Sequence, residues 1–133
     1  MRDGVVPEHW TDFYESTHIP AAVRDRDRLY VTGHTGEDSE GIFSPDPEVQ
    51  IRQTFQNVSL TLATAGASWA DVVELNSYHV GLRAQSDVLI AVAGEFLGDP
   101  YPAWTAAGVT ELFDEGAVVE ISCTAVLTNG LKT

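Results

Sequence analysis

Two segments near the C-terminus decide how this chain of 133 residues is interpreted: Tyr101-Pro102-Ala103-Trp104-Thr105 and Gly116-Ala117-Val118-Val119-Glu120-Ile121. Each contains a proline or glycine that favours a turn, followed by β-branched or aromatic residues. We therefore expect two strands, around 103–109 and at 117–127. Apart from Glu120, neither face of the second strand carries a charge.

Further strand signals lie upstream. The run 28–32 is rich in strand formers and ends at Gly33. We expect its antiparallel partner at 21–24, with 25–27 as the turn between them. Residues 72–80 alternate between apolar and polar side chains, which predicts a strand with one buried face.

Two helices are expected between these strands. The first begins at Pro47, with Asp46 as its N-cap, and ends at Gly66. Its apolar residues form one face at helical spacing: Ile51, Phe55, Val58 and Leu62. The second has Ser86 as its predicted N-cap and ends before Gly98. Its apolar residues are Val88, Leu89, Val92, Phe96 and Leu97. This order of elements predicts an α+β fold with a single mixed sheet of about six strands and two helices packed on one face.

The length and composition limit the class of protein. A chain of 133 residues predicts one domain, 1–133, with about the first 15 residues as an extension. We expect no membrane partner, because no apolar run approaches the ~18 residues of a membrane span. The start lacks the apolar core of a signal peptide, and Cys123 is the one cysteine. A cytoplasmic location is therefore expected.

The charge balance argues against nucleic acid as a partner. Seven Lys and Arg residues oppose twenty Asp and Glu residues, which gives a formal net charge of −13. Such a field repels phosphates. No spacing of His, Cys or carboxylates matches a metal site, and no glycine-rich loop cradles a phosphate, so we expect neither a metal nor a cofactor.

Three further residues can be interpreted from their positions in the sequence, and one of them, His34, has two interpretations. His34 follows Gly33 at a strand end, where it is either a general acid or base or a solvated loop residue. His79 lies within a predicted strand and is interpreted as a structural histidine. Cys123 is interpreted as a small core residue.

The second face of the sheet suggests self-association. If both helices cover one face, the other must meet water or a partner, and the strand 117–127 is not polar enough for open water. A sheet face of modest polarity favours a partner subunit.

The order and spacing of these segments resemble the YjgF/Rid family, which includes the reactive-intermediate imine deaminases. The resemblance runs from about His18 to Leu127. The segments that carry it are Ala22-Val23-Arg24, Leu29-Tyr30-Val31-Thr32-Gly33, the helix from Gln53 to Gly66, Asp71-Val72-Val73 with Tyr78, Glu95-Phe96-Leu97-Gly98, Tyr101-Pro102-Ala103 and Val119-Glu120-Ile121. It implies the YjgF (chorismate-mutase-like) fold, a homotrimer, and small-molecule sites in the clefts between subunits.

The resemblance also implies which residues form the site. The family's usual Pro-Ala-Arg-Ser segment reads Pro-Ala-Trp-Thr here, so Trp104 stands at the position of the arginine that grips the substrate carboxylate. Glu120 falls on the acid that positions the hydrolytic water. The substrate-binding positions fall on His18, Thr32, Gly33, Trp104, Thr105 and Ala106, and a position that is often asparagine falls on Ile90.

The replacement at Trp104 changes the expected substrate. A guanidinium clamps a carboxylate through two charge-assisted hydrogen bonds, whereas an indole offers one N–H donor and no charge. The sequence therefore argues against 2-imino acids such as 2-iminobutyrate. Trp104 is either a flat wall for stacking or for a cation, or an apolar plug of the cleft.

Two functional classes follow. The first is a Rid-like hydrolase or deaminase that acts on a reactive enamine or imine, with Glu120 orienting water and Thr32, Gly33 and Thr105 placing the substrate. The alternative is a non-catalytic trimer that binds a small metabolite. A ribonuclease role fits the acidic composition least.

Overall fold

The computed structural model describes residues 2–127, which form a six-stranded mixed sheet with helices on one face. The strand order is β1-β2-β3-β6-β4-β5, and only β4 and β5 run parallel among the described pairs. The strands are β1 (Arg2–Val5), β2 (Ala22–Asp25), β3 (Arg28–Thr35), β4 (Val72–His79), β5 (Ala103–Gly108) and β6 (Val119–Val126). The helices are α1 (Thr11–Thr17), α2 (Pro47–Thr64) and α3 (Leu82–Ala93), with short 3-10 turns η1 (Glu8–Trp10) and η2 (Trp69–Asp71). The predicted α+β class and mixed sheet are confirmed.

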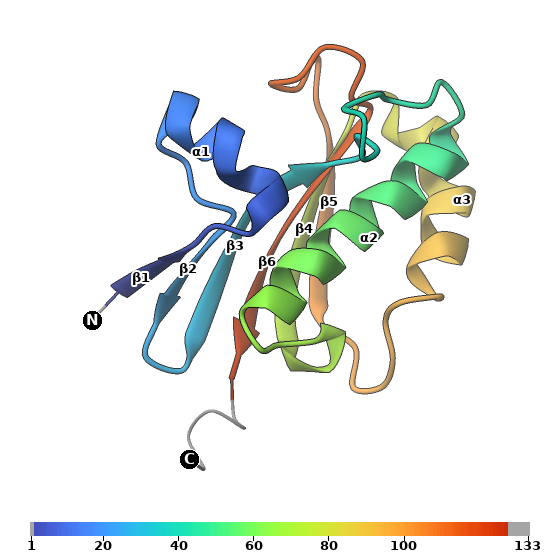
Figure 1. The fold of residues 1–133 in the computed structure, drawn as a ribbon. Coiled ribbons are helices and arrows are strands. Elements are labelled where there is room, and N and C mark those ends of the chain that lie inside the picture. The colour runs from blue at the N-terminus through green and yellow to red at the C-terminus, as the bar shows by residue number, and fades with distance from the viewer. Residues whose placement is uncertain (1, 128–133) are drawn as a thin grey trace.

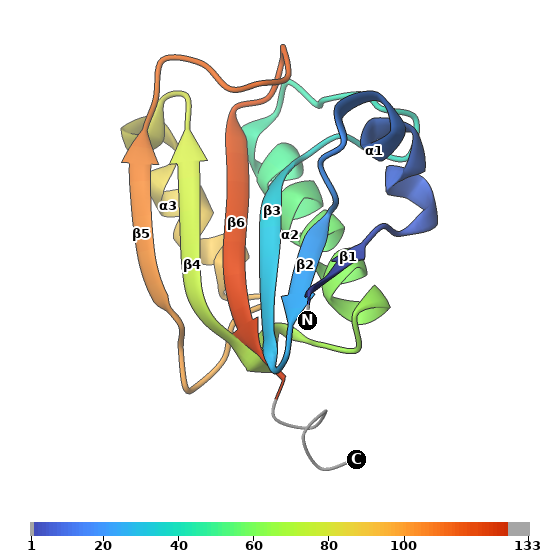
Figure 2. The ribbon, with the colours of Figure 1, turned by 90° about the vertical axis from the view of Figure 1, so that its left-hand side faces the viewer.

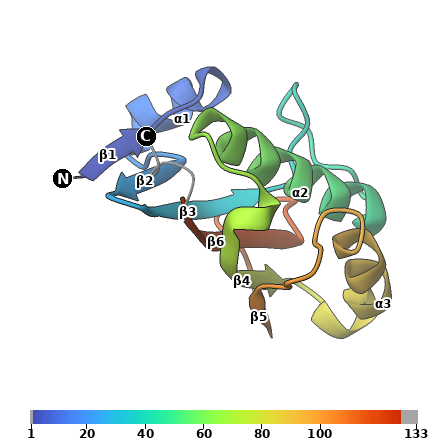
Figure 3. The same cartoon turned by 90° about the horizontal axis from the view of Figure 1, so that it is seen from below.

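Helices α2 and α3 pack on the same face of the sheet, as expected (Figure 1). Figure 2 shows the opposite face, with the strands in front and these two helices behind them. Seen from below, the sheet curves from β1 to β5 while α1 lies beside the β1–β2 edge (Figure 3). No helix among residues 2–127 is long and apolar enough to cross a membrane.

Helix α2 has the start and end that the sequence predicts. The Asp46 carboxylate accepts a hydrogen bond from the backbone N–H of Glu48 at 3.0 Å, and Pro47 occupies the first turn. Gly66 follows the helix with φ of +78°, the left-handed conformation that glycine tolerates. The predicted apolar face is completely buried: Ile51, Phe55, Val58 and Leu62.

Helix α3 differs from the prediction at both ends. It begins at Leu82 after Gly81, whose φ of +86° turns the chain out of β4, and Ser86 lies inside the helix. The Ser86 hydroxyl donates to the Arg83 carbonyl at 3.0 Å, so the predicted N-cap at Ser86 is wrong. The early start has a tertiary cause. The buried Gln85 side chain donates to the carbonyls of Val80 and Val118 and ties the first turn to the sheet.

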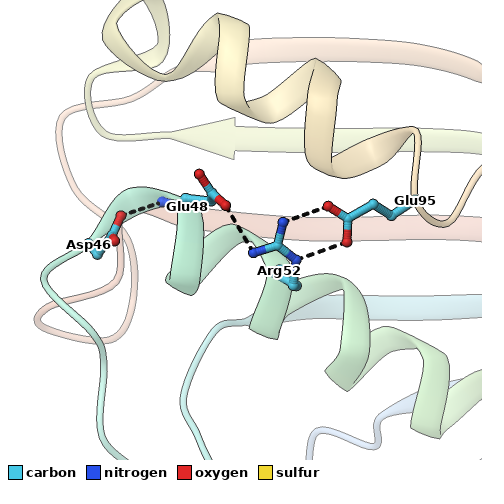
Figure 4. A network of polar contacts seen from close by, with 4 residues as sticks. All are labelled: Asp46, Glu48, Arg52 and Glu95. Carbon is cyan, nitrogen blue, oxygen red and sulfur yellow. Dashed lines mark hydrogen bonds and ion pairs between the residues drawn. The ribbon is translucent and has the colours of Figure 1, made fainter.

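The segment after α3 packs against α2 instead of extending α3. Phe96 lies beyond the helix and stacks on Phe55, with ring centroids 5.1 Å apart. Next to it, the Glu95 carboxylate accepts two hydrogen bonds from the Arg52 guanidinium, which also contacts Glu48 at 3.2 Å (Figure 4). These contacts hold the connection between α3 and β5 against α2.

The N-terminal residues join the sheet and one of its edges. β1 pairs antiparallel with β2, and η1 and α1 follow β1 in the chain. The Trp10 indole N–H donates to the Ile19 carbonyl at 2.9 Å, and the Trp10 ring lies 4.6 Å from the His34 ring, centroid to centroid. His18 ends α1 in the left-handed conformation, with φ of 63°. The sequence predicted none of these elements.

The two sheet faces differ in what covers them. In β6, Val119 and Ile121 are completely buried beneath the helices, and Glu120 alternates with them onto the other face. That open face also carries Tyr30, which is 47% exposed and lies opposite Thr124. It is a mixed surface of polar and apolar side chains, as the sequence predicts for the last strand.

Candidate functional site

A β-bulge in β3 lies beside a cavity in the described part of the chain. The register between β3 and β6 shifts between Val31 and His34, so Thr32 and Gly33 leave the regular ladder. Beside them lies a cavity of about 510 Å³ that we call the Glu120 cavity. Most of its side chains are aromatic (Trp10, Phe13, Phe43 and Phe113) or acidic (Asp12, Glu37, Asp114 and Glu120), and His9, Ile19, Thr32 and Thr35 complete the lining.

Glu120 lies directly against Gly33. A Cβ atom on Gly33 would stand 2.7 Å from Oε2 of Glu120, so the carboxyl group occupies space that any other residue would need. Burial raises the pKa of the Glu120 carboxyl, and the nearby charge of Asp114 raises it further. A carboxyl that takes up and releases protons closer to neutral pH than usual suits acid–base chemistry.

Two more carboxyl groups share this cavity. The Thr35 hydroxyl lies 2.6 Å from Oε2 of Glu37 and 3.2 Å from Oδ2 of Asp114. Burial raises the pKa of Glu37 despite the hydrogen bond from Thr35. The buried Asn57 amide donates to the carbonyls of Thr35 and Glu37, both at 2.9 Å, and so fixes the backbone that carries them. Sequence reasoning missed Glu37 and Asp114. Glu37 could have been found from its position in a loop directly after a strand, where functional residues are common. No comparable sequence signal marked Asp114.

The aromatic wall comes from segments far apart in the chain. The rings of Trp10 and Phe13 meet edge to face at 5.2 Å, and those of Phe13 and Phe113 at 6.4 Å. Phe113 is 78% exposed at the edge of the cavity. The predicted N-terminal extension therefore supplies part of the wall, which sequence reasoning also missed.

Thr32 and His34 have structural partners. The Thr32 hydroxyl donates to the Pro20 carbonyl at 2.7 Å, although the residue lines the cavity. His34 is buried, so its interpretation as a solvated loop residue is wrong. Its Nδ1–H donates to the Thr32 carbonyl at 2.6 Å, which leaves Nε2 to accept from Thr61 at 2.8 Å. Burial lowers the pKa of His34 to about 4, and the ring stays neutral at pH 7. These contacts give it a packing role.

Trp104 lies on the other side of the sheet from Glu120. It pairs with Leu75, a completely buried residue under the helices, whereas Glu120 points to the open face. The indole lines an apolar groove of about 440 Å³ between β5 and α3, which we call the Trp104 groove. Its other lining residues are Leu82, Arg83, Ser86, Leu89, Ile90 and Ala106.

A chain of hydrogen bonds fixes the orientation of Trp104. Its Nε1–H donates to Oγ of Ser77 at 2.8 Å. His79 Nδ1–H donates to the amide oxygen of Gln85 at 2.8 Å, so Nε2 of His79 accepts a hydrogen bond from the Ser77 hydroxyl, also at 2.8 Å. His79 is completely buried and structural, as predicted. Trp104 both packs on the core and forms a wall of the groove.

The remaining predicted site residues are dispersed within one chain. Ile90 and Ala106 accompany Trp104 in its groove, and Thr105 alternates onto the open face beside Asn76. His18 is exposed at the end of α1 and is not among the residues that line either cavity. One chain therefore brings Thr32, Gly33 and Glu120 together and holds Trp104 apart from them.

The structure adds a positive charge that sequence reasoning missed. Arg83, in the first turn of α3, lines the groove beside Trp104. The predicted start at Ser86 had left Arg83 outside the helix. Cys123 is buried as predicted, and burial raises its pKa to about 12, which keeps the thiol protonated. Within residues 2–127 no three His, Cys, Asp or Glu side chains are placed to hold a metal ion.

Comparison with known proteins agrees with this architecture. Residues 14–127 match the family model described as Endoribonuclease L-PSP. The chain is 37% identical over 112 residues to the RutC family protein YjgH of Escherichia coli, covering 84% of this chain and 86% of that protein. A solved structure of protein YJGH superposes with a TM-score of 0.85 at 35% identity, covering 95% of this chain and 96% of that one.

A second solved structure is that of RidA from the Antarctic bacterium Psychrobacter. It has a TM-score of 0.76 at 32% identity and covers 81% of this chain and 87% of its own. The family match spans most of the chain, and the sheet and helices of the relatives follow the same path. This chain belongs to the Endoribonuclease L-PSP family, which is also known as the YjgF or Rid family.

Proposed function

We propose that this chain is a Rid-like hydrolase that deaminates a small reactive enamine or imine without a cofactor, and that the substrate is not a 2-imino acid. The observation that carries the proposal is the Glu120 carboxyl, held against Gly33 in a cavity large enough for a small molecule. The reaction class is inferred from membership of the family. The exclusion of 2-imino acids is inferred from the residues at the site.

Glu120 can perform the proton transfers that imine hydrolysis needs. Water adds to the carbon of the C=N bond, and one of its protons moves to the nitrogen to give a carbinolamine. The hydroxyl proton of the carbinolamine then moves to the nitrogen as the C–N bond breaks, which leaves a carbonyl compound and ammonia. A carboxylate beside the oxygen can accept each of these two protons in turn and, as a carboxylic acid, donate it to the nitrogen. The raised pKa of Glu120 favours both steps near neutral pH.

The restriction on the substrate rests on charge. The residue that would clamp a carboxylate is Trp104, and its single N–H is already donated to Ser77. The Glu120 cavity adds Glu37 and Asp114, which repel an anion. An imine without a carboxylate avoids both problems.

The proposal includes a homotrimer with sites at the subunit boundaries. Trp104 and Glu120 point to opposite faces of one sheet, so they meet only if different subunits contribute them. The mixed open face is a surface that a partner subunit would cover. A small molecule would then bind between the Glu120 cavity of one subunit and a neighbour.

The decisive experiment measures ammonia release from matched imines, generated in place, with and without a carboxylate. We expect turnover of the imine without the carboxylate, and loss of that turnover in Glu120→Gln. Asp3→Asn is the control, because Asp3 is exposed on β1 and does not line the cavity. Binding without ammonia release from any imine would instead support the non-catalytic metabolite-binding trimer.

A further inference from the structure

We infer that the Glu120 cavity selects an organic cation, a protonated amine or iminium group on a flat apolar body. The inference rests on the proposed function, because it names the substrate class of that same site. Three features of the cavity carry it: the sign of its charges, the hydrogen-bonding groups that it leaves free, and the aromatic side chains at its edge.

The charged side chains of the cavity are almost all acidic. Asp12, Glu37, Asp114 and Glu120 line it, and none of its described lining residues is a lysine or arginine. His9 is the one basic side chain among them. An anionic ligand would add a like charge to this group in a partly dry environment, whereas a cation offsets the repulsion between the carboxylates.

The free hydrogen-bonding groups have the same preference. The Thr32 hydroxyl donates to Pro20, and the Thr35 hydroxyl donates to Glu37, so neither proton is available to a ligand. The Trp10 N–H is likewise donated to Ile19. The oxygens of these hydroxyl groups and of the carboxylates can still accept, and they match a ligand that brings N–H donors, while His9 is the one other polar side chain of the lining.

The aromatic side chains provide the surface for the rest of the ligand. Phe13 and Phe113 meet edge to face at 6.4 Å, and Trp10 continues the wall from Phe13 at 5.2 Å. The negative faces of such rings attract a cation, and their area binds a flat apolar body. Phe113 is 78% exposed, which is unusual for a phenylalanine and leaves its ring available to a ligand.

The Trp104 groove has the opposite character and serves as an internal comparison. Its lining is apolar apart from Ser86 and the Arg83 guanidinium, and no carboxylate lines it among the described residues. A ligand anion would be drawn to Arg83, and a ligand cation to the Glu120 cavity. The sign of the ligand charge therefore reports which site is occupied.

The test is calorimetric titration of the full chain at pH 7 and low salt with three probes of similar shape: benzylamine, benzyl alcohol and benzoate. We expect benzylamine to bind at least about tenfold more tightly than benzyl alcohol, and benzoate not to bind in the Glu120 cavity. Equal affinities for the amine and the alcohol, or preference for benzoate, would overturn the inference.

Variants locate the binding. Asp114→Asn and Glu37→Gln keep the side-chain shape and should each weaken benzylamine about fivefold or more, while Asp3→Asn makes the same change in net charge and should have no effect. Phe113→Ala removes a side chain that is 78% exposed, and it should weaken the binding of both benzylamine and benzyl alcohol. If Asp114→Asn and Phe113→Ala both bind benzylamine as tightly as the unmodified chain, the cation does not occupy this cavity and the inference is wrong.

The two proposals fail in different ways. Tight binding of benzylamine without ammonia release from any imine would leave the cation site in place and remove the hydrolase. Ammonia release from imines by a protein that ignores benzylamine would keep the hydrolase and remove the cation preference.

Discussion

The Glu120 carboxyl fills the space that a side chain on Gly33 would need. A Cβ atom on Gly33 would lie 2.7 Å from Oε2 and 2.8 Å from Cδ of Glu120. The bulge in β3 brings the glycine backbone to the carboxyl group, and the absence of a side chain lets the carboxyl stay beside the cavity. The two residues are 87 positions apart in sequence, yet the position of the Glu120 carboxyl depends on the absence of a side chain at Gly33.

Gly33→Ala should therefore displace the Glu120 carboxyl. We expect the chain to fold, because a flexible side chain can move, and ammonia release to fall at least about tenfold, since a small misplacement of a catalytic group costs much of its rate. The matched control is Gly98→Ala, where a Cβ would meet nothing within 4 Å. Unchanged turnover in Gly33→Ala would show that the position of this carboxyl does not matter.

Glu120→Gln should change how stability depends on pH. The folded chain holds the Glu120 proton more tightly than the unfolded chain does, because burial raises its pKa above the ordinary value of 4.5. Ionisation therefore costs stability as pH rises from about 4.5 through the raised pKa, and the glutamine variant escapes this cost. We expect the difference in Tm between variant and unmodified chain to grow from pH 4.5 to pH 8. A constant difference would argue against a raised pKa.

His34 should give the opposite pH dependence. The unfolded chain binds a proton near pH 6.5, whereas buried His34 binds one only near pH 4, so this contribution is complete above pH 6.5 and is lost as pH falls toward 4. From 6.5 to about 4, at ~1.4 kcal/mol for each pKa unit, the free energy of unfolding falls by at most about 3.5 kcal/mol. Urea unfolding of the unmodified chain and His34→Gln at pH 7 and pH 4.5 measures it. The difference in free energy of unfolding between the unmodified chain and His34→Gln should be smaller at pH 4.5 than at pH 7.

Trp104→Arg should restore affinity for carboxylate-bearing imines. We expect the unmodified chain to release little or no ammonia from 2-iminobutyrate, and the arginine variant to gain about ten- to a hundredfold, as a charge-assisted bidentate contact provides. Trp104→Lys controls for charge alone, since an ammonium lacks the planar fork. Robust turnover of 2-iminobutyrate by the unmodified chain would refute the restriction on substrate, and Arg83→Gln would then test whether Arg83 supplies the missing charge.

The homotrimer can be tested on the open face of the sheet. Tyr30 is 47% exposed in the middle of that face, so Tyr30→Glu should dissociate the assembly in light scattering. Leu60, 54% exposed on the outer side of α2, offers the control Leu60→Glu, which should leave the assembly intact. A monomer at micromolar concentration for the unmodified chain would contradict the trimer.

Local signals in the sequence were sufficient for much of the fold. Asp46 and Pro47 start α2 and Gly66 ends it, because caps and left-handed turns depend on neighbours within a few residues. The alternation in β6 correctly identified Val119 and Ile121 as one face. The start of α3 could not be found this way, because Gln85 bonds to Val118, 33 positions later.

The sequence by itself determined the family, the order of strands and helices from β2 onward, and the chemical types of Gly33, Trp104 and Glu120. Only the tertiary structure decided how they are combined. The pairing of β6 between β3 and β4 places Glu120 against Gly33 and turns it away from Trp104. The cavity wall joins the N-terminal Phe13 to Phe113, and Thr35 reaches Asp114 across 79 positions. Such contacts arise from sheet register and long-range packing, which short-range patterns do not encode.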